Sequence, residues 1–354
     1  MATTTTTTFD GASSVVTDVY SREILHNALG VMRFEEFVTV REELLKQSGD
    51  TIAFTKYTDF GGPTVALTDG DAMATDSVTA STINVVVTEY GKACEVSEKL
   101  LQLAWDDVMS EHAFLLGRHY AKWGPDKLIR DQLLGLKEAT YTLNNVQNVG
   151  TTINDSGNSP TTLFGGNAAD RTDLGSDDTF GAAEVRRMVE ELQTKNTPKF
   201  NNDFYVCAIH PHQARYLRAD AQWIDANNYH RTRAVFNGEL GRFDDVIFIE
   251  SSHMPHGKAS SVADISYIYD GNNQAEGLTT ADNALSSANA LTGSFDVYMG
   301  VMFGAGCVGY GVALPVEMRD NGITDFGRKH GLAWYSIYGA AIINSDYRVV
   351  IETT

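Results

Sequence analysis

Alternating apolar and polar residues mark two stretches near the start of the chain as strands. Ile52 and Phe54 alternate with polar residues within residues 51–57, and a similar pattern runs through residues 82–97. A period of two places all apolar side chains on one face of a strand. The intervening residues are rich in Gly, Asp, Thr and Ala and cannot build a core of their own. The pattern predicts a long hairpin whose tip depends on another surface for contacts.

Helical periodicity dominates most of the remaining first half. It predicts two short helices between residues 17 and 45 and a short helix that Ser97 caps. A longer helix is expected over residues 108–136. Gly124-Pro125 lies inside it, and proline removes a backbone donor and clashes with the preceding turn. The longer helix should therefore kink or split there.

The second half contains more expected strands than helices. Residues 139–179 are dense in Asn, Thr, Gly and Asp and predict a surface insertion. An amphipathic helix follows over residues 180–195, capped by Thr179 or an aspartate before it. The other expected elements are a helix over 211–219 and strands over 204–209, 246–250, 262–269, 295–303, 334–343 and 348–352. A helix-rich half followed by a strand-rich half predicts the α+β fold class.

Charge narrows the range of partners. The chain has 27 Lys and Arg against 46 Asp and Glu, a formal net charge of −19. Such a chain should repel phosphates, which argues against sequence-specific DNA binding. Enclosing DNA without gripping it is compatible with this sign. The hydrophobic share of 43% supports a sizeable core that needs no disulfide or metal.

The beginning of the sequence and the cysteines indicate a cytoplasmic chain. Residues 1–14 are threonine-rich, without a basic segment followed by an apolar one, so we expect a mobile or partner-ordered arm and not a signal peptide. The sequence has no apolar run of the length that a membrane span needs. Cys94, Cys207 and Cys307 are odd in number and far apart, which predicts free thiols.

Candidate chemical motifs favour structural roles. Residues 304–309 match the glycine pattern of a dinucleotide site, but an extended run ending at Pro315 follows where that site needs a helix. We expect a glycine-rich strand and no cofactor. Proline interrupts the pairs His210/His212 and His253/His256, so turn residues are favoured over a metal site. A soluble hydrolase with a dispersed Ser/His/Asp site stays open as an alternative.

Four stretches, in this order, resemble the major capsid proteins of tailed phages. The likeness is to capsid proteins with the Hong Kong phage-type fold, specifically to the branch of the coliphage N-four capsid protein. These stretches are Val87-Thr88-Glu89-Tyr90-Gly91-Lys92-Ala93 with Val96 to Leu101, Ile209 to Asp220 with Trp223, Asn237 to Ser251, and Gly331-Leu332-Ala333-Trp334 through Tyr338-Gly339-Ala340. The function that the resemblance implies is self-assembly into an icosahedral head around double-stranded DNA, without catalysis. A related nanocompartment shell is the alternative.

The resemblance also implies a division of the chain. We expect an N-terminal arm with short helices (1–50), an extended-loop hairpin (51–97) and a peripheral domain with a long spine helix and the polar insertion (98–179). An axial domain (180–310) and C-terminal strands that return to the core (311–354) complete the division. The bend at Gly124-Pro125 and the length of the insertion depart from the family pattern.

The implied partners are copies of the chain, arranged as hexamers and pentamers, with packaged DNA and scaffold, portal or cement proteins as further candidates. Subunit contacts are expected on the extended loop, at Tyr57, Phe60, Gly61, Gly62, Pro63, Val65, Leu67 and Met73. Basic residues of the spine helix face either DNA or solvent, namely Arg118, Lys122, Lys127 and Arg130. The fold's archetype cross-links subunits through a loop lysine. Residues 57–91 contain no lysine, so cross-linking of this kind is not expected. A long N-terminal scaffolding segment is not expected either. The site of action is the virion, after assembly in the host cytoplasm.

Overall fold

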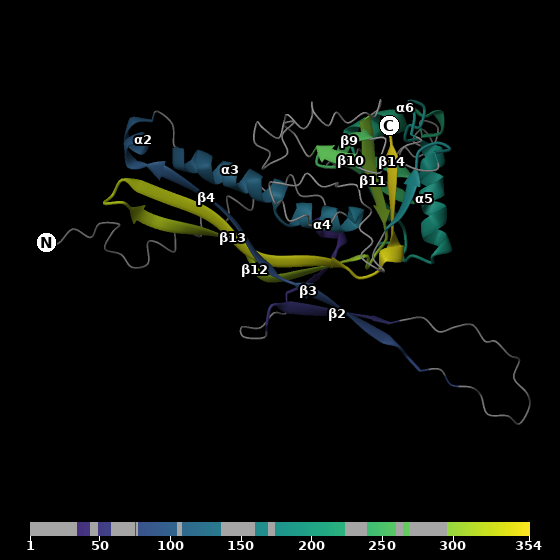
Figure 1. Cartoon of the computed structure of the whole chain (residues 1–354), viewed down its shortest axis with the longest axis horizontal. Helices are drawn as coiled ribbons and strands as arrows, with labels where there is room; N and C mark the ends of the chain where they lie inside the picture. Colours follow the sequence, from purple (N-terminus) through teal and green to yellow (C-terminus); the bar gives the residue numbers. More distant parts are fainter. Residues whose placement is uncertain are drawn as a thin grey trace, which may run out of the picture.

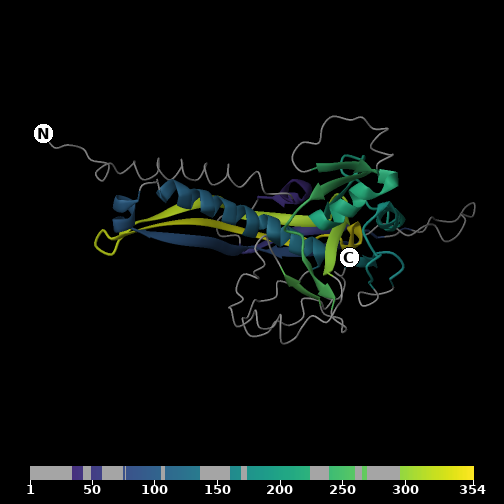
Figure 2. The ribbon, with the colours of Figure 1, turned by 90° about the horizontal axis from the view of Figure 1, so that it is seen from above.

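A long, mainly antiparallel sheet with helices along it forms one end of the molecule, and a second sheet with helices forms the other (Figures 1 and 2). A two-stranded ribbon packs on the first sheet and projects from the body (Figure 1). The computed structural model describes residues 34–42, 49–57, 75, 77–104, 108–135, 160–168, 174–223, 239–259, 265–268 and 296–354. Both helices and sheets are present in each part, as the predicted α+β class requires.

The smaller sheet orders its strands β1 (Thr39–Arg41), β12 (Val308–Thr324), β13 (Lys329–Ile342) and β4 (Thr88–Ser97). Alternate side chains of its strands, among them Met318, Leu332 and Trp334, face one side. Helix α3 (Val108–Trp123) covers that side with Leu116 and Tyr120. Burial of these apolar faces against each other holds the sheet and the helix together.

Three consecutive helices connect the two ends of the molecule. Helix α2 (Glu98–Leu103) begins at Ser97, whose Oγ accepts a hydrogen bond from the Leu100 N–H at 3.3 Å, which confirms the predicted cap. The predicted long helix is split into α3 and α4 (Pro125–Leu134), with the break at Gly124. Helix α4 ends at Gly135, whose positive φ of 70° suits a residue without a Cβ.

The larger sheet orders its strands β10 (Ile265–Ile268), β9 (His256–Ala259), β11 (Asp296–Phe303), β6 (Tyr205–Ile209), β8 (Val246–Glu250) and β7 (Glu239–Phe243). Strand β14 (Arg348–Thr353) also pairs with β11, and β5 (Thr161–Phe164) with β14. Helices α5 (Ala182–Thr194) and α6 (Pro211–Ala219) pack on one face. Strand β6 is apolar throughout because Val206 and Ala208 enter one core and Tyr205, Cys207 and Ile209 the other.

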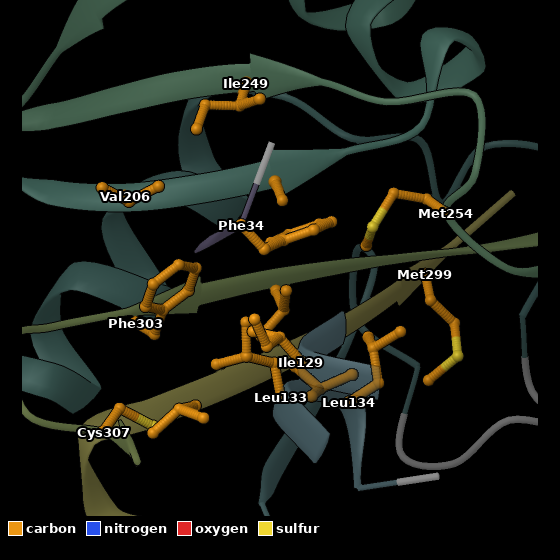
Figure 3. Packing of buried hydrophobic residues seen from close by; sticks show 14 of the residues in the cluster. Phe34, Ile129, Leu133, Leu134, Val206, Ile249, Met254, Met299, Phe303 and Cys307 are labelled. Carbon is orange, nitrogen blue, oxygen red and sulfur yellow. The ribbon is translucent and has the colours of Figure 1, made fainter. Parts of the chain in front are cut away.

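One apolar core joins the two sheets through helix α4. Its side chains Ile129, Leu133 and Leu134 lie among residues of the larger sheet, including Val206 and Phe303 (Figure 3). Val308, Tyr310 and Tyr338 of the smaller sheet belong to the same cluster. Phe34, from the short 3₁₀ helix region η1 (Glu35–Phe37), is completely buried in the centre. The two parts therefore share one continuous core.

The hairpin is present, but its second strand is shorter than predicted. Strand β2 (Thr51–Tyr57) pairs with β3 (Ala80–Val86), whereas the rest of the expected strand 82–97 is β4, which pairs with β13. The Val87 N–H donates to the Asp50 carbonyl at 2.9 Å, where the two strands separate. The expectation of one continuous strand was wrong, since the alternation continues across a change of partner.

Three other local predictions need correction. The polar insertion contains a strand, β5, and a buried Leu174. Helix α5 begins after Gly181 and not after Thr179, because the carboxylates of Glu184 and Asp220 accept from the N–H groups of Gly181 and Ala182. Residues 35–41 form η1 and β1 in place of the second short helix, and the first lies outside the described residues.

The glycine-rich strand expected at residues 304–309 begins only at Val308, and it extends past Pro315 to Thr324. A turn with Gly306 at φ +74° leads into β12, whose residues from Val308 onward pair with β13. The expected strand over 334–343 is the C-terminal part of β13, and those over 204–209, 246–250, 295–303 and 348–352 coincide closely with β6, β8, β11 and β14. Strand β10 covers the centre of the expected strand 262–269.

Candidate assembly surfaces

The β2–β3 ribbon is fixed at its root by a small apolar cluster. Ile52 and Phe54 of β2 and Val85 of β3 are buried against the smaller sheet. Two glycines of β12 make room for them. A Cβ at Gly311 would lie 2.7 Å from Cδ1 of Ile52, and one at Gly309 would lie 2.9 Å from Cζ of Phe54. The ribbon thus approaches the sheet more closely than larger residues would allow.

Polar contacts add to this attachment. The Lys56 Nζ donates to the Asn344 Oδ1 at 2.9 Å, which links β2 to the segment after β13. The Arg41 guanidinium donates to the Ala53 carbonyl at 2.8 Å and lies 4.8 Å from the centroid of the Phe54 ring. This contact holds Lys56 against the body of the subunit.

Beyond its root the ribbon leaves the body (Figure 1). Tyr57, at the end of β2, is 67% exposed, and Val78, just before β3, is exposed as well. Such apolar side chains on a projecting ribbon gain little from the subunit that carries them. The other expected contact residues lie outside the described residues, namely Phe60, Gly61, Gly62, Pro63, Val65, Leu67 and Met73.

The predicted basic set does not lie on one surface. Arg118 is exposed, 5.9 Å from the Phe114 ring centroid, and the Lys122 ammonium lies 5.3 Å from that of Trp123. The Lys127 ammonium lies 3.5 Å from the Asp131 carboxylate. Arg130 is only 3% exposed, pairs with Asp131 at 2.6 Å and donates to the His253 carbonyl. Arg130 is a buried structural residue, so its proposed position facing DNA was wrong.

The candidate chemical groups have structural roles. Burial raises the pKa of the Cys307 thiol to about 12 and also raises that of Cys207, so both thiols are protonated and poorly nucleophilic at neutral pH. Cys94 is half-buried, and all three cysteines are free. Among the residues that the structure describes, no group of three or more His, Cys, Asp or Glu is arranged to hold a metal ion.

The first histidine pair caps a helix. His210 Nδ1 accepts from the His212 N–H at 3.1 Å at the start of α6, and the His212 ring stacks on Tyr298 with centroids 4.1 Å apart. In the second pair, the His253 N–H donates to the Ser251 Oγ at 3.3 Å in the turn after β8. His210 and His253 thus follow strands β6 and β8 as expected, whereas His212 lies in α6 and His256 begins β9. Within the described part of the chain, no helix is long and apolar enough to cross a membrane.

Comparisons with solved structures identify the fold. The capsid of Ralstonia phage GP4 matches with a TM-score of 0.64 at 16% identity, over 91% of this chain and 90% of the other. The capsid of cyanophage Pam1 matches with a TM-score of 0.61 at 17% identity, over 91% and 92% of the two chains. At this level of identity the likeness shows the fold alone. No curated protein sequence matches significantly.

A match to a sequence family identifies the family of the chain, which the structural likeness alone does not. The model of the family described as phage capsid protein matches residues 29–344, which is most of the chain. The match includes the ribbon, the split spine helix, the smaller sheet and all of the larger sheet except β14. The chain therefore belongs to the phage capsid protein family, and its role is that of a structural major capsid protein in the virion of a bacteriophage.

Proposed function

We propose that copies of this chain assemble, as hexamers and pentamers in the host cytoplasm, into a closed icosahedral shell around double-stranded DNA, and that the protein acts by assembly and not by catalysis. The observation that carries the proposal is the ribbon, which is clamped at its root and exposes apolar side chains beyond it. Repetition of such a contact around closed symmetry turns individually weak contacts into a stable shell.

The ribbon is suited to reach a neighbouring copy. Its two strands pair from Thr51–Val86 to Tyr57–Ala80 and pack on the smaller sheet, so the segment between Tyr57 and Ala80 starts from a fixed base. The clustered anchors at one end fix its direction. A base with a fixed direction lowers the entropic cost of binding a neighbouring copy.

The net charge of the chain supports a shell that encloses DNA without binding it tightly. The formal net charge of −19 opposes firm attachment to phosphates. Arg118, Lys122 and Lys127 on the α3–α4 spine remain candidates for local contact with DNA. Scaffold, portal and cement proteins are further proposed partners of the assembly.

The register of the ribbon provides a direct test. Because Tyr57 pairs with Ala80, residues 58–79 can be replaced by a two-residue Asn-Gly turn that closes the hairpin. We expect this variant to keep the ribbon root and the melting temperature of the subunit but to form no shells. The measurement is sedimentation and electron microscopy of the purified variant beside the unaltered chain.

A second variant separates reach from apolar contact. It keeps the full loop length and replaces Phe60, Val65, Leu67 and Met73 with serine. If apolar contacts hold the neighbour, this variant also loses assembly; if length alone matters, it assembles. Normal shells formed by the Asn-Gly variant would contradict the proposed role of the ribbon.

A further inference from the structure

Two histidines stand at the start of helix α6, directly after strand β6. His210 precedes the helix and His212 lies in its first turn. Both rings contact the ring of Tyr298 on β11, with centroid distances of 4.8 Å for His210 and 4.1 Å for His212. The His212 ring also contacts the Tyr216 ring one turn further along the helix, at 5.2 Å. These contacts hold the two imidazoles in fixed positions, so the atoms that face their nitrogens determine where they carry protons.

His210 caps the helix only while its Nδ1 atom carries no proton. Nδ1 lies 3.1 Å from the backbone nitrogen of His212, and that N–H can only donate. Nδ1 must therefore accept, and the proton of the neutral ring lies on Nε2. An imidazolium has N–H groups at both nitrogens and no acceptor, so protonation removes the cap. Asparagine, a common residue at this position of a helix, would accept the same bond without depending on pH.

The ring of His212 is constrained in the same way. Its Nε2 atom lies 3.1 Å from Nη2 of Arg215, which follows one turn along α6. A guanidinium has donors and no acceptor, so Nε2 must accept and the neutral ring carries its proton on Nδ1. A proton on Nε2 would place two cations in contact. The helix dipole adds to this cost, because its positive end lies at the start of α6.

The neighbouring strands add titratable groups near the pair. Strand β8 adjoins the end of β6, and the carboxylate of its Glu250 binds an arginine of α6 at 2.6 Å. In the pairing of β9 with β11, His256 lies opposite Tyr298, and Lys258 lies opposite Asp296. Each of these two acidic residues has a basic residue bound to it or opposite it in register. The charge in direct contact with a histidine ring is that of a guanidinium, which favours uncharged imidazoles.

Gln213 connects the first turn of α6 to the larger sheet. Its Oε1 atom accepts from the His210 N–H at 3.1 Å. Its Nε2 atom donates to the Tyr298 carbonyl at 3.1 Å and to Thr353 Oγ1 at 2.9 Å. The Gln213 side chain is completely buried. Opening of the first turn therefore loosens the contact of α6 with β11 and with the end of β14.

We propose that the first turn of α6 is a proton-sensitive latch, which is closed while His210 and His212 are uncharged and opens when acid protonates them. The latch regulates the packing of α6 on the larger sheet, and it goes beyond the proposed function because it belongs to the single subunit. The open turn binds protons that the closed turn excludes, so acid favours the open turn. The closed turn is stable above the usual histidine pKa of about 6.5 and loses stability as the pH falls below it. At about pH 5, each excluded proton multiplies the open population roughly thirtyfold.

Hydrogen exchange measured by mass spectrometry compares the unaltered chain with His210→Asn, whose cap does not depend on pH. At about pH 7.5 the amides of α6 should exchange alike in the two chains, because both caps accept. At about pH 5 these amides should exchange at least about tenfold faster in the unaltered chain. Comparison at a common pH removes the chemical effect of pH on exchange, and the contribution of His212 is present in both chains. The amides of β13 are the internal reference and should exchange alike throughout.

Two further variants complete the test. Arg215→Gln removes the cation beside His212, so relative to the unaltered chain its α6 should be better protected at about pH 5 than at about pH 7.5. His330→Gln, on β13, is the matched control. The His330 Nε2 atom lies 2.9 Å from the Asp320 carboxylate and far along the chain from α6, so this variant should leave the exchange of α6 unchanged at both pH values.

The outcomes distinguish the latch from the proposed function. Equal exchange of α6 in the unaltered chain and in His210→Asn at about pH 5 would overturn the latch. A difference between the two chains that is the same at both pH values would overturn it as well. The measurement uses the subunit, so a chain that forms no shells refutes the proposed function and leaves the latch intact. An α6 that does not respond to acid leaves the proposed function intact.

Discussion

Buried charged residues fix both ends of helix α4. At its start the Asp126 carboxylate accepts a hydrogen bond from the Phe34 N–H at 2.6 Å. At its end Arg348 of β14 donates to the carbonyls of Gln132 and Leu133, and burial lowers the pKa of this guanidinium to about 10. The negative carboxylate lies at the positive end of the helix dipole and the positive guanidinium at its negative end, so both charges stabilise the helix. These residues tie the segment before η1 and the last strand to the spine.

Glu35 gives a test of the electrostatics at this junction. Burial, and secondarily the nearby Asp126, raise its pKa above the usual 4.5. The folded state therefore binds the proton more tightly than the unfolded chain does, and this contribution to stability is lost as pH rises through the folded-state pKa. Glu35→Gln should raise the free energy of unfolding at pH 7 and leave it unchanged well below pH 4.5. Urea unfolding at both pH values measures this.

The neighbouring Glu36 is the matched control, because its side chain is exposed on the same short helix. Glu36→Gln should change the free energy of unfolding little at either pH. A Glu35→Gln variant that is less stable than the unaltered protein at pH 7 would contradict the assignment of a desolvated carboxylate.

At the scale of elements, the break in the spine helix depends on glycine more than on proline. Pro125 occupies the first turn of α4, where its missing N–H costs nothing. A Cβ on Gly124, in contrast, would lie 2.3 Å from the Tyr120 carbonyl oxygen. Gly124→Ala should destabilise the subunit by about 1–3 kcal/mol, and Pro125→Ala by less than about 1 kcal/mol. Thermal unfolding compares the two, and equal losses would contradict this division of roles.

The basic face of α3 yields a prediction about DNA. If it contacts the enclosed genome, filled heads with Arg118→Gln and Lys122→Gln should release DNA at a lower temperature, with a smaller effect of salt on release. Arg319→Gln is the control, because the Arg319 guanidinium stacks on Tyr335 of the smaller sheet and not on α3. Identical release from both variants would indicate a solvated helix face.

Periodicity predicted where elements lie better than which elements pair. It located β2, β6, α6, β8 and β14 closely, because each has a clear apolar pattern or a terminal signal. It could not show that β3 and β4 separate at Val87, since both sheets require the same alternation. Strand β5 was missed because its polar surroundings resemble a loop, and it is stabilised by pairing with the distant β14.

At the scale of the whole molecule, the sequence predicted those parts of the candidate assembly surfaces that have a local pattern, and not those that depend on contacts between distant segments. The hairpin was recognisable from two alternating stretches around a segment without a core. Burial of Arg130 depends on Asp131 and on the His253 carbonyl, 123 positions away, so no local pattern reveals it. The contact between α2 and the turn after β12 was likewise not predicted, because it forms only when β13 and β4 pair.

The central claim is that the ribbon contacts a neighbouring copy, and a three-dimensional reconstruction of assembled shells tests it most directly. The account predicts that Tyr57 and Val78, exposed in the single subunit, are covered by another copy in every class of subunit. Shells in which both side chains remain in solvent, or are covered by the subunit's own body, would contradict it.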